Sequence, residues 1–242
     1  MKSLAVLIVA SLGHASAVDT PVPFGVGERL AYDVQLGPLP VGEGSMEVLG
    51  VVTIRGRQAW HTRFQVHGGI PFYRVDDLLE SWIDVEKVSS LRFVQDFDEN
   101  GRTRERQYDM FPERAVYQEK DSAERPSVSD PLDEGAFLYY LRTITLEVGR
   151  TYEFPRYFKP DHNPVIVKVL RRERVSVPAG SFDALVLQPV LKVKGMFSEQ
   201  GEALIWLSDD RNRIIVQLKS QTKFGPLNLF LKSYRPPTSP NP

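Results

Sequence analysis

"GVGERLAYDVQLGPLPVGEGSMEV", Gly25 to Val48, is the stretch that decides the fold class. Apolar and polar residues alternate from Leu30 to Leu36, the pattern of a strand with one buried face. The Gly/Pro cluster from Gly37 to Pro40 predicts a bend, and Gly42 and Gly44 are expected to let the chain re-enter the sheet. A phosphate-binding loop would lead into a helix, whereas this cluster leads into another strand-like run. The stretch therefore predicts a bend within an antiparallel sheet.

The same alternation returns in "AWHTRFQVH", residues 59–67. Turn signals bound such runs at short intervals: "IRGRQ" at 54–58, "DENGRT" at 98–103, "VPAGSF" at 177–182 and "SDDRNR" at 208–213. The chain is thus predicted to be mostly β, as an antiparallel curved sheet or barrel of about a dozen strands. Two related β halves are the alternative, because "VGERLAY" at 26–32 resembles "VGRTYEF" at 148–154.

One segment departs from the strand pattern. In "SDPLDEGAFLYYLRTI", Asp130 is a candidate N-cap and Pro131 suits the first helical position, which predicts one short helix near 131–142. A polar linker, Glu119 to Ser129, precedes it. Linker and helix, residues 119–142, are expected to join two β halves of a single all-β domain over residues 18–235. The helix is expected to cover or plug an open side of the sheet.

The N-terminus has the features of a secretory signal peptide. Lys2 precedes an apolar run, and small residues at Ala15 and Ala17 precede Val18. The run is shorter than the roughly 20 residues that span a bilayer, so we expect residues 1–17 to be cleaved and the mature chain to carry no transmembrane segment. The predicted location is the periplasm, with the extracellular space as the alternative. The Pro-rich tail, residues 236–242, is expected to be disordered.

Composition restricts the functional classes. Lys and Arg number 30 against 31 Asp and Glu, so the chain lacks the strong positive charge that attracts nucleic acid. There are no cysteines, which excludes disulfides, thiol nucleophiles and thiolate metal sites. No cofactor is expected.

Histidine and serine patterns do not indicate catalysis. His61 and His67 are six strand residues apart, or roughly 20 Å, which is too far to share a metal ion. Ser181 lies in the turn "AGSFD" and lacks the surroundings of a G-x-S-x-G nucleophile. We therefore predict no catalytic residues and no metal site.

Three pairs of adjacent carboxylates remain: Asp76–Asp77, Asp133–Glu134 and Asp209–Asp210. Neighbours on a strand point to opposite faces, so adjacency does not indicate a glycosidase pair. Asp209 and Asp210 are interpreted as turn residues. A polysaccharide hydrolase would need two carboxylates that are remote in sequence.

A hairpin centred on Asn100-Gly101 holds the candidate ligand-binding residues. A two-residue turn there would place one side of the sheet in register as Glu99 with Arg102, Phe97 with Arg104, Gln95 with Arg106 and Phe93 with Tyr108. Arginine can donate two hydrogen bonds to a phosphate or carboxylate, and the aromatic residues supply an apolar floor. The candidate site is therefore Arg102, Arg104, Arg106, Phe97 and Tyr108. The alternative is that these arginines are solvated, with their stems lying on Phe97.

An ordered set of motifs carries a family resemblance. These are "GERLAYDVQLGPLPVGEGSMEV" near the start, "DPLDEGAFLYYLR" in the middle, "VPAGSFDALVLQP" at 177–189 and "GEALIWLSDDRNRIIVQLKSQTKFGPLNLFL" at 201–231. Together they resemble the secreted bacterial domain-of-unknown-function family 3108. The resemblance implies a mostly β, exported envelope protein and brings no catalytic residues.

The functional prediction is an exported cell-envelope protein that is not an enzyme and binds an amphipathic ligand, lipid-like or glycan-like, or a partner protein. It follows from the export signal, the half-buried sheet and the arginine-lined hairpin. The alternatives are a polysaccharide hydrolase and a structural module of an envelope assembly. The sequence does not predict the oligomeric state.

Overall fold

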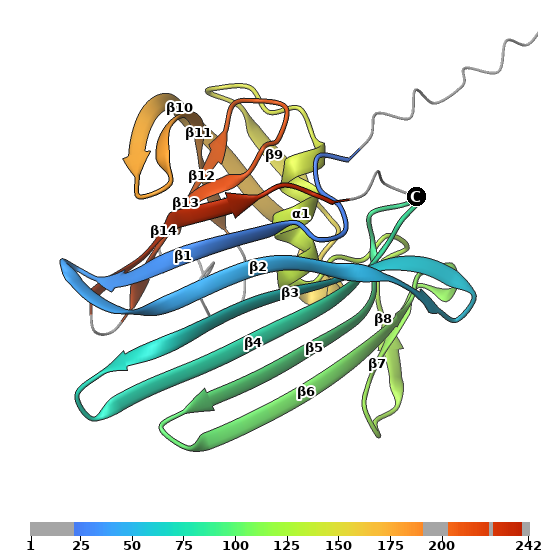
Figure 1. Ribbon diagram of the computed structural model, residues 1–242. Coiled ribbons are helices and arrows are strands. Elements are labelled where there is room, and N and C mark those ends of the chain that lie inside the picture. The colour runs from blue at the N-terminus through green and yellow to red at the C-terminus, as the bar shows by residue number, and fades with distance from the viewer. Residues whose placement is uncertain (1–21, 191–202, 223–224, 239–242) are drawn as a thin grey trace, which may run out of the picture.

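The computed structural model describes residues 22–190, 203–222 and 225–238. The predicted signal peptide and the last residues of the predicted tail lie outside these ranges. The described chain forms one 14-stranded antiparallel sheet, in the order β8-β7-β6-β5-β4-β3-β2-β1-β14-β13-β12-β11-β10-β9. The sheet curves strongly, and its edge strands β8 and β9 are not paired with each other (Figure 1). The predicted mostly β, antiparallel curved architecture is confirmed.

The strands fall in two runs along the chain. The first run is β1 (Arg29–Leu36), β2 (Leu39–Ile54), β3 (Arg57–Ile70), β4 (Tyr73–Asp84), β5 (Ser90–Glu99), β6 (Arg102–Phe111), β7 (Val116–Glu119) and β8 (Glu124–Pro126). The second is β9 (Thr151–Phe154), β10 (Val165–Val177), β11 (Gly180–Val190), β12 (Leu204–Ser208), β13 (Ile215–Thr222) and β14 (Gly225–Arg235). Short 3-10 helices occupy Pro112–Arg114 and Pro160–His162.

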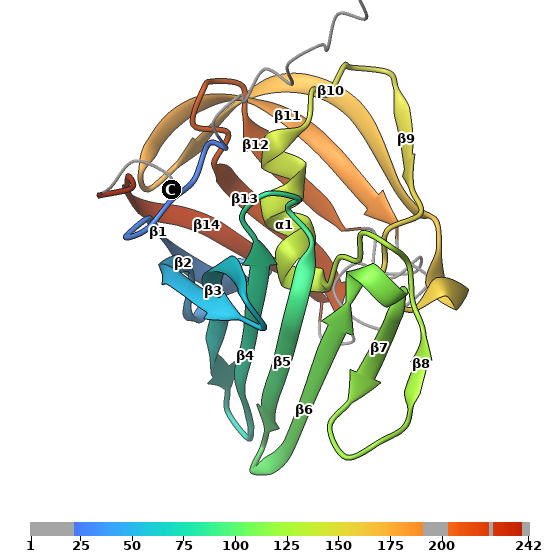
Figure 2. The same cartoon turned by 90° about the vertical axis from the view of Figure 1, so that its right-hand side faces the viewer.

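Between the two runs lies the helix α1 (Glu134–Thr143), on the concave side of the sheet (Figure 2). Phe137, Leu138 and Leu141 are buried, so the helix fills the concavity and forms the core together with both runs of strands. Among the described residues, no helix is both long and apolar enough to cross a membrane. The predicted role of a plug inside the curved sheet agrees with this placement.

The helix begins later than the sequence predicts. Its N-cap is Asp133, not Asp130, and the Asp133 carboxylate accepts a hydrogen bond from the backbone N–H of Ala136 at 2.9 Å. The preceding Leu132 is held in an extended conformation by backbone hydrogen bonds with Arg156 and Phe158. Because these partners are remote in sequence, the local capping pattern around Pro131 could not reveal them.

The opening stretch also differs in detail. The turn of the β1–β2 hairpin is Gly37-Pro38, and β2 starts directly afterwards at Leu39. Gly42 does not help the chain re-enter the sheet. It lies opposite Gly68, where a Cβ on Gly42 would stand 2.1 Å from the His67 carbonyl oxygen. Glycine is required there because β2 and β3 approach closely.

Two segments are more ordered than expected. The predicted polar linker contains β8, which pairs with β7 just before it in a short hairpin that the sequence does not signal because its residues do not alternate in polarity. In the predicted disordered tail, the backbone N–H of Thr238 donates to the Val26 carbonyl at 2.9 Å. This contact places the described end of the chain beside the start of β1.

The two runs of strands repeat local geometry, as the alternative of two β halves anticipates. Gly27 and Gly149 have φ values of 84° and 83°, and each donates its N–H to the carbonyl of a valine, Val48 or Val169, at 2.9 and 2.8 Å. A β-bulge follows each valine.

A second pair of bulges continues the correspondence. One lies between Trp82 and Ile83 and the other between Trp206 and Leu207. In both runs, following the strand pairings from the first bulge across the next two strands leads to the residue just before the second bulge. The two runs are therefore built on one plan, with α1 placed between them in the chain.

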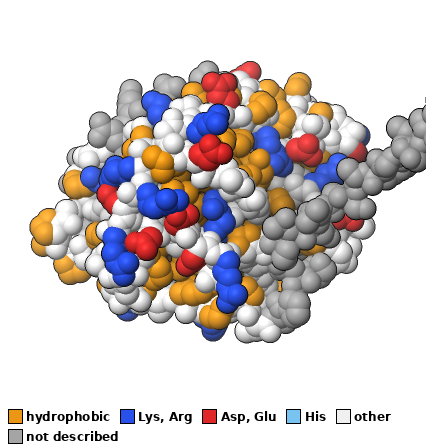
Figure 3. Space-filling model, turned by 90° about the horizontal axis from the view of Figure 1, so that it is seen from above, with side chains coloured by type: hydrophobic (Ala, Val, Ile, Leu, Met, Phe, Trp, Pro, Cys, Tyr) orange, Lys and Arg blue, Asp and Glu red, His pale blue; other side chains and the backbone are white. Residues whose placement is uncertain are grey.

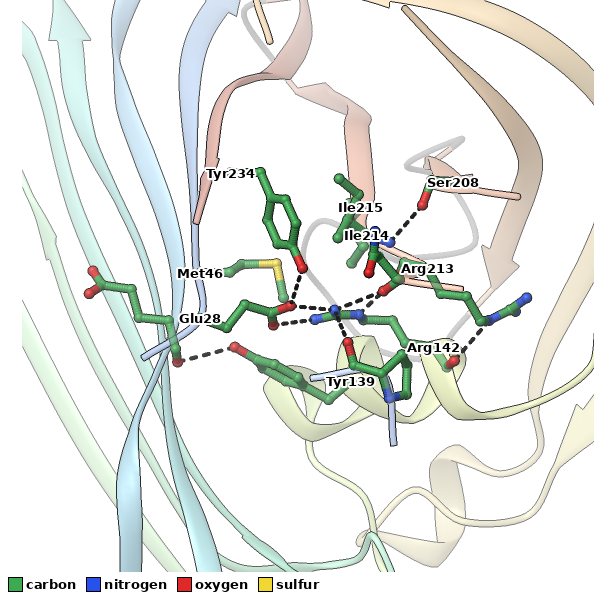
Figure 4. A network of polar contacts seen from close by, with 12 residues as sticks. Glu28, Met46, Tyr139, Arg142, Ser208, Arg213, Ile214, Ile215 and Tyr234 are labelled. Atoms are coloured by element: carbon green, nitrogen blue, oxygen red, sulfur yellow. Dashed lines mark hydrogen bonds and ion pairs between the residues drawn. The ribbon is translucent and has the colours of Figure 1, made fainter. Parts of the chain in front are cut away.

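A buried ion pair ties the helix to the first run. Arg142 and Glu28 are both fully buried, and the guanidinium donates to both carboxylate oxygens at 2.7 Å (Figure 4). The remaining guanidinium hydrogens go to the carbonyls of Pro23, Asn212 and Arg213. Both charges of this pair thus have hydrogen-bonded partners, which is the condition for such a pair to be tolerated.

Arg213, in the loop after β12, completes the connection to the second run. Its guanidinium donates to the carbonyls of Arg142 and Ile144 at 2.8 Å and so satisfies the C-terminal end of the helix (Figure 4). Arg142 donates in return to the Arg213 carbonyl at 2.9 Å. The two arginines therefore connect the helix, the segment that precedes β1 and the β12–β13 loop.

Replacing Arg142 by Met is expected to cost about 3–5 kcal/mol of unfolding free energy, because the Glu28 carboxylate would stay buried without an opposite charge. Adding Glu28→Gln to that variant should recover part of the loss. The exposed pair of Arg174 and Asp183 provides the control, since Arg174→Met should cost less than about 1 kcal/mol. Denaturant unfolding measures all three variants; equal losses for Arg142→Met and Arg174→Met would contradict the role of this ion pair.

Candidate functional site

The β5–β6 hairpin has the predicted register. Asn100 and Gly101 form the turn with φ values of 57° and 77°. The cross-strand partners are Glu99 with Arg102, Phe97 with Arg104, Gln95 with Arg106 and Phe93 with Tyr108. The predicted hairpin is therefore confirmed, whereas ligand binding by these residues stays a prediction.

These residues divide between the core and its margin. Tyr108 and Phe93 are buried in the core with Phe158, so this side of the hairpin is the concave side of the sheet. Alternation along the strands then places Phe97 and Arg104 on the same side, farther from the helix. Tyr108 is only 1% exposed, so its ring is part of the core and only its hydroxyl group can take part in a site.

Beyond the core, the concave side is only half buried. We call this region the mouth and define it by Val66 of β3, Asp77 and Leu79 of β4, Phe97 of β5 and Arg104 of β6. The Arg104 guanidinium lies 5.4 Å from the centre of the Phe97 ring. This is the stacking that the alternative reading of the hairpin anticipates, and it leaves the charged end of Arg104 exposed.

A lysine that the sequence did not single out joins this side. Lys159 reaches in from the loop before β10, and its Nζ donates to the Tyr108 hydroxyl at 3.2 Å while lying 4.4 Å from the ring centre. Arg106 donates to the same hydroxyl at 3.4 Å and lies 3.8 Å from Glu119. Within the described ranges, Lys159 has no carboxylate within 4 Å. Only the folded chain brings Lys159 to Arg106, because the two are remote in sequence.

Asp77 adds a titratable group to the mouth. Its Oδ1 is buried and has no hydrogen-bond partner among the described residues. Burial, the largest cause, and the nearby charges of Glu99, Asp76 and Asp98 together raise the pKa of Asp77 to about 6, against the opposing effect of Arg104. The mouth therefore gains negative charge as the pH rises through about 6.

None of the three adjacent carboxylate pairs faces its partner across a cleft. Asp77 points to the concave side and Asp76 to the outer side of β4. Asp209 pairs with Arg172 at 2.6 Å. Asp210 accepts hydrogen bonds from the N–H groups of Asn212 and Arg213, which confirms the predicted turn role.

The third pair lies at the start of α1. Asp133 is fully buried, and burial raises its pKa to about 7 although Ser81 donates to it at 2.6 Å. Glu134 accepts a hydrogen bond from the Tyr157 hydroxyl at 2.8 Å. These carboxylates hold the helix against β4 and the loop after β9, a structural role.

The histidines and the serine that the sequence analysis considered for metal binding or catalysis lie apart from the mouth. His61 stacks on Trp82 on the outer side of β3 and β4, with ring centres 4.4 Å apart. His67 is exposed near the tip of the β3–β4 hairpin. The hydroxyl of Ser181 lies 2.8 Å from that of Ser176 across the exposed β10–β11 hairpin. None of these three residues contacts another in a way that indicates a catalytic set.

An open groove of about 1060 Å³ lies at the tips of the β3–β4 and β5–β6 hairpins. Tyr73 and Val75 line it on the concave side, and Phe72, Asn100 and Gly101 line it at the tips. The face of the molecule seen in Figure 3 carries acidic and basic side chains interspersed with apolar ones. None of the five residues that define the mouth lines this groove, so the two are neighbouring features of the same hairpins.

One comparison with a solved structure supports the fold. A "Beta-barrel-like Protein of Domain of Unknown Function DUF1849 from Brucella abortus" is similar with a TM-score of 0.56 and 13% identity, over 88% of this chain and 98% of that chain. A "putative lipoprotein from Parabacteroides distasonis ATCC 8503" gives a TM-score of 0.34 and 12% identity, over 90% of this chain and 100% of that chain. At these identities the first likeness shows the fold alone.

A comparison with curated proteins finds no match. The model of one protein family matches residues 31–232, which include the whole mouth and α1. Since the match covers most of the sequence, the chain belongs to the family described as "Protein of unknown function (DUF3108)".

Proposed function

We propose that this protein is exported to the cell envelope and binds an amphipathic anion in the mouth without transforming it. The apolar part of the ligand would lie on Val66, Leu79 and Phe97. Its anionic group would bind Arg104 and the ammonium group of Lys159. A lipid-like ligand fits this division better than a glycan, because the half-buried floor is aliphatic and aromatic with few hydrogen-bonding groups.

The observation that carries the proposal is the lack of ion pairs at these two cations. Arg29, Arg63 and Arg171 of other strands pair with carboxylates at 2.7 to 2.9 Å. Arg104 has a Phe97 ring beside it and Lys159 has a phenol, but neither has a carboxylate within 4 Å in the described parts of the chain. Cations held in place over aromatic rings and left unneutralised are suited to a phosphate, sulfonate or carboxylate group.

The closed core near the helix also supports ligand binding in the mouth. Toward the helix the core is closed, and the ionic groups there, Glu28 and Arg142, are inaccessible and mutually satisfied. The ligand would therefore enter at the distal half of β3 to β6, where the described concave positions are half buried. A structural module of an envelope assembly would instead present a flat apolar patch. A failure to bind any ligand would favour that alternative.

Protein purified without detergent from the envelope fraction should begin at Val18 and carry a co-purified amphiphile. N-terminal sequencing checks the cleavage, and mass spectrometry of an organic extract checks the ligand. A chain that retains residues 1–17 would refute the export signal. An extract with no amphiphile, together with no binding of an added one, would refute the ligand-binding proposal.

Binding of a dansyl-labelled alkyl sulfonate should depend on the two cations. Arg104→Gln and Lys159→Gln should each weaken it about tenfold, since a hydrogen bond to a charged group contributes about 1.5–3 kcal/mol. Arg174→Gln removes an exposed charge on the β10–β11 hairpin and is the matched control. Fluorescence titration gives the affinities; equal affinity in all four proteins would place the ligand elsewhere.

The affinity should also fall as the pH rises through about 6, because the ionised Asp77 repels the anion. A sulfonate probe keeps its charge over this range, so the change reports the protein. Asp77→Asn should remove the pH dependence, whereas Asp76→Asn, on the outer side of β4, should keep it.

Ionisation of the Asp77 carboxyl is also expected to lower the stability of the folded protein. The folded-state pKa of Asp77 lies above the ordinary value of 3.8, so its effect on stability is most favourable below about pH 4 and is lost as the pH rises through about 6. Asp77→Asn should thus raise the melting temperature at pH 8 but not at pH 4. A variant with an unchanged melting temperature at both pH values would contradict the assigned burial of this carboxyl.

A further inference from the structure

The last part of β2 is an open edge of the sheet. β1 pairs with β2 only as far as Glu47, and the backbone of Val48 is hydrogen-bonded to Gly27 and Glu28. Beyond that point β2 continues through Leu49–Ile54, where its one partner among the described residues is β3. This end of the β2–β3 hairpin projects past the start of β1 (Figure 1). We call Leu49–Ile54 the β2 edge.

Backbone groups of the β2 edge are left without partners. The turn that follows it is Arg55-Gly56, so Ile54 and Arg57 close the hairpin. Counted from that pair, bonded and non-bonded positions alternate along the antiparallel ladder, and the N–H and C=O groups of Val51 and Thr53 point away from β3. Within the part of the chain that the structure describes, no backbone group is hydrogen-bonded to them from the open side. A further strand can therefore pair here through main-chain hydrogen bonds.

The β2 edge also lacks the residues that ordinarily keep an open edge unpaired. It contains no charged residue and no proline, and the side chains of Leu49 and Val52 are 39% and 38% exposed. Arg55 in the turn does not protect it, because its guanidinium is bound to Asp109 and to backbone carbonyls of β5 and β6. Natural proteins block exposed edges with charges, prolines or bulges. An apolar edge without charge or proline is therefore suited to pairing.

The corresponding edge in the second run of strands is protected. In the described ranges, β10 likewise has no strand beside it on one side beyond Val169. Counted from its bulge, β10 has the charged residues Arg172–Arg174 where β2 has Val51–Thr53. The tip of the β10–β11 hairpin is also tied to β14, since the Ala179 N–H donates to the Leu231 carbonyl at 2.9 Å. The same structural plan thus occurs once with a protected edge and once with an edge that is free to pair.

We propose that the β2 edge pairs antiparallel with the β2 edge of a second copy of this chain, about a two-fold axis at Val52. In this register the outward backbone groups of Val51 meet those of Thr53 in the other copy. The two Val52 side chains face each other, and each Ile54 lies opposite Gly50 of the other copy. A Cβ on Gly50 would have no heavy atom within 4 Å, so the space above this glycine is open to the Ile54 side chain.

The match of the β2 edge with itself favours a second copy over an unrelated strand. Because the edge is uncharged, two copies bring no like charges together, and the large side chain of Ile54 meets the small residue Gly50. Two-fold pairing occupies the edge in both copies and closes the assembly as a dimer. Since few residues of each copy take part, a weak dimer that forms in the micromolar range is expected.

Sedimentation velocity of the mature protein over a range of concentrations tests the dimer. Val52→Lys and Val52→Glu should each weaken association about tenfold or more, because each places two like charges against each other at the axis. An equimolar mixture of the two variants should associate again, since every mixed pair then brings opposite charges together. Leu170→Lys is the matched control, because Leu170 on β10 is 39% exposed, as is Leu49. It should associate like the wild type.

Hydrogen exchange locates the contact. The amide hydrogens of Val51 and Thr53 should exchange more slowly at a protein concentration at which the dimer forms than at one at which it dissociates. Unchanged exchange at both positions in a protein that does dimerise would place the contact elsewhere and refute the proposal.

Three other results would overturn the proposal. Wild-type protein that stays monomeric up to about 1 mM would do so and would direct attention to a strand of another protein. Association that Val52→Lys leaves unchanged would exclude the β2 edge. A mixture of the Lys and Glu variants that fails to associate would contradict the register about Val52. The β2 edge lies at the other end of the β2–β3 hairpin from Val66 in the mouth, so sulfonate binding should be the same for Val52→Lys and the wild type. The dimer and the ligand-binding mouth can therefore fail separately.

Discussion

The buried ion pair of Glu28 and Arg142 is the interaction on which the arrangement of this molecule depends. Glu28 directly precedes β1 and Arg142 lies in the last turn of α1. Arg142 also donates to the carbonyl of Pro23, before β1, and to two carbonyls of the loop between β12 and β13. A buried pair of this kind adds little net stability compared with apolar packing, but separating its two charges inside the core is strongly unfavourable. It therefore fixes where the helix lies within the curved sheet.

The position of the helix decides which part of the concave side is open. Near Arg142 the helix, both runs of strands and the aromatic side chains of Phe24 and Tyr139 close the core. At the far ends of β3 to β6 the helix no longer covers the sheet, and the same alternating positions become half exposed. One continuous strand face is thus core at one end and a candidate binding surface at the other.

The sequence predicted those features that depend on neighbouring residues. The Asn100-Gly101 turn and its register follow from local backbone preferences, and so do the alternating strands and the turns around them. The start of the helix was misplaced because the extended conformation of Leu132 depends on Arg156 and Phe158. Lys159 was missed for the same reason, since only the fold brings a loop residue to the Tyr108 hydroxyl. The Glu28–Arg142 pair joins residues that no periodic pattern relates.

Locating a bound amphiphile on the chain tests most directly whether the mouth binds a ligand. A photoreactive alkyl sulfonate, cross-linked to the native protein and mapped by peptide mass spectrometry, should label peptides that contain Leu79, Phe97 or Lys159. The outer side of the sheet and the β10–β11 hairpin should stay unlabelled. Label spread over the outer surface, or confined to the second run of strands, would contradict a ligand-binding mouth beyond the helix.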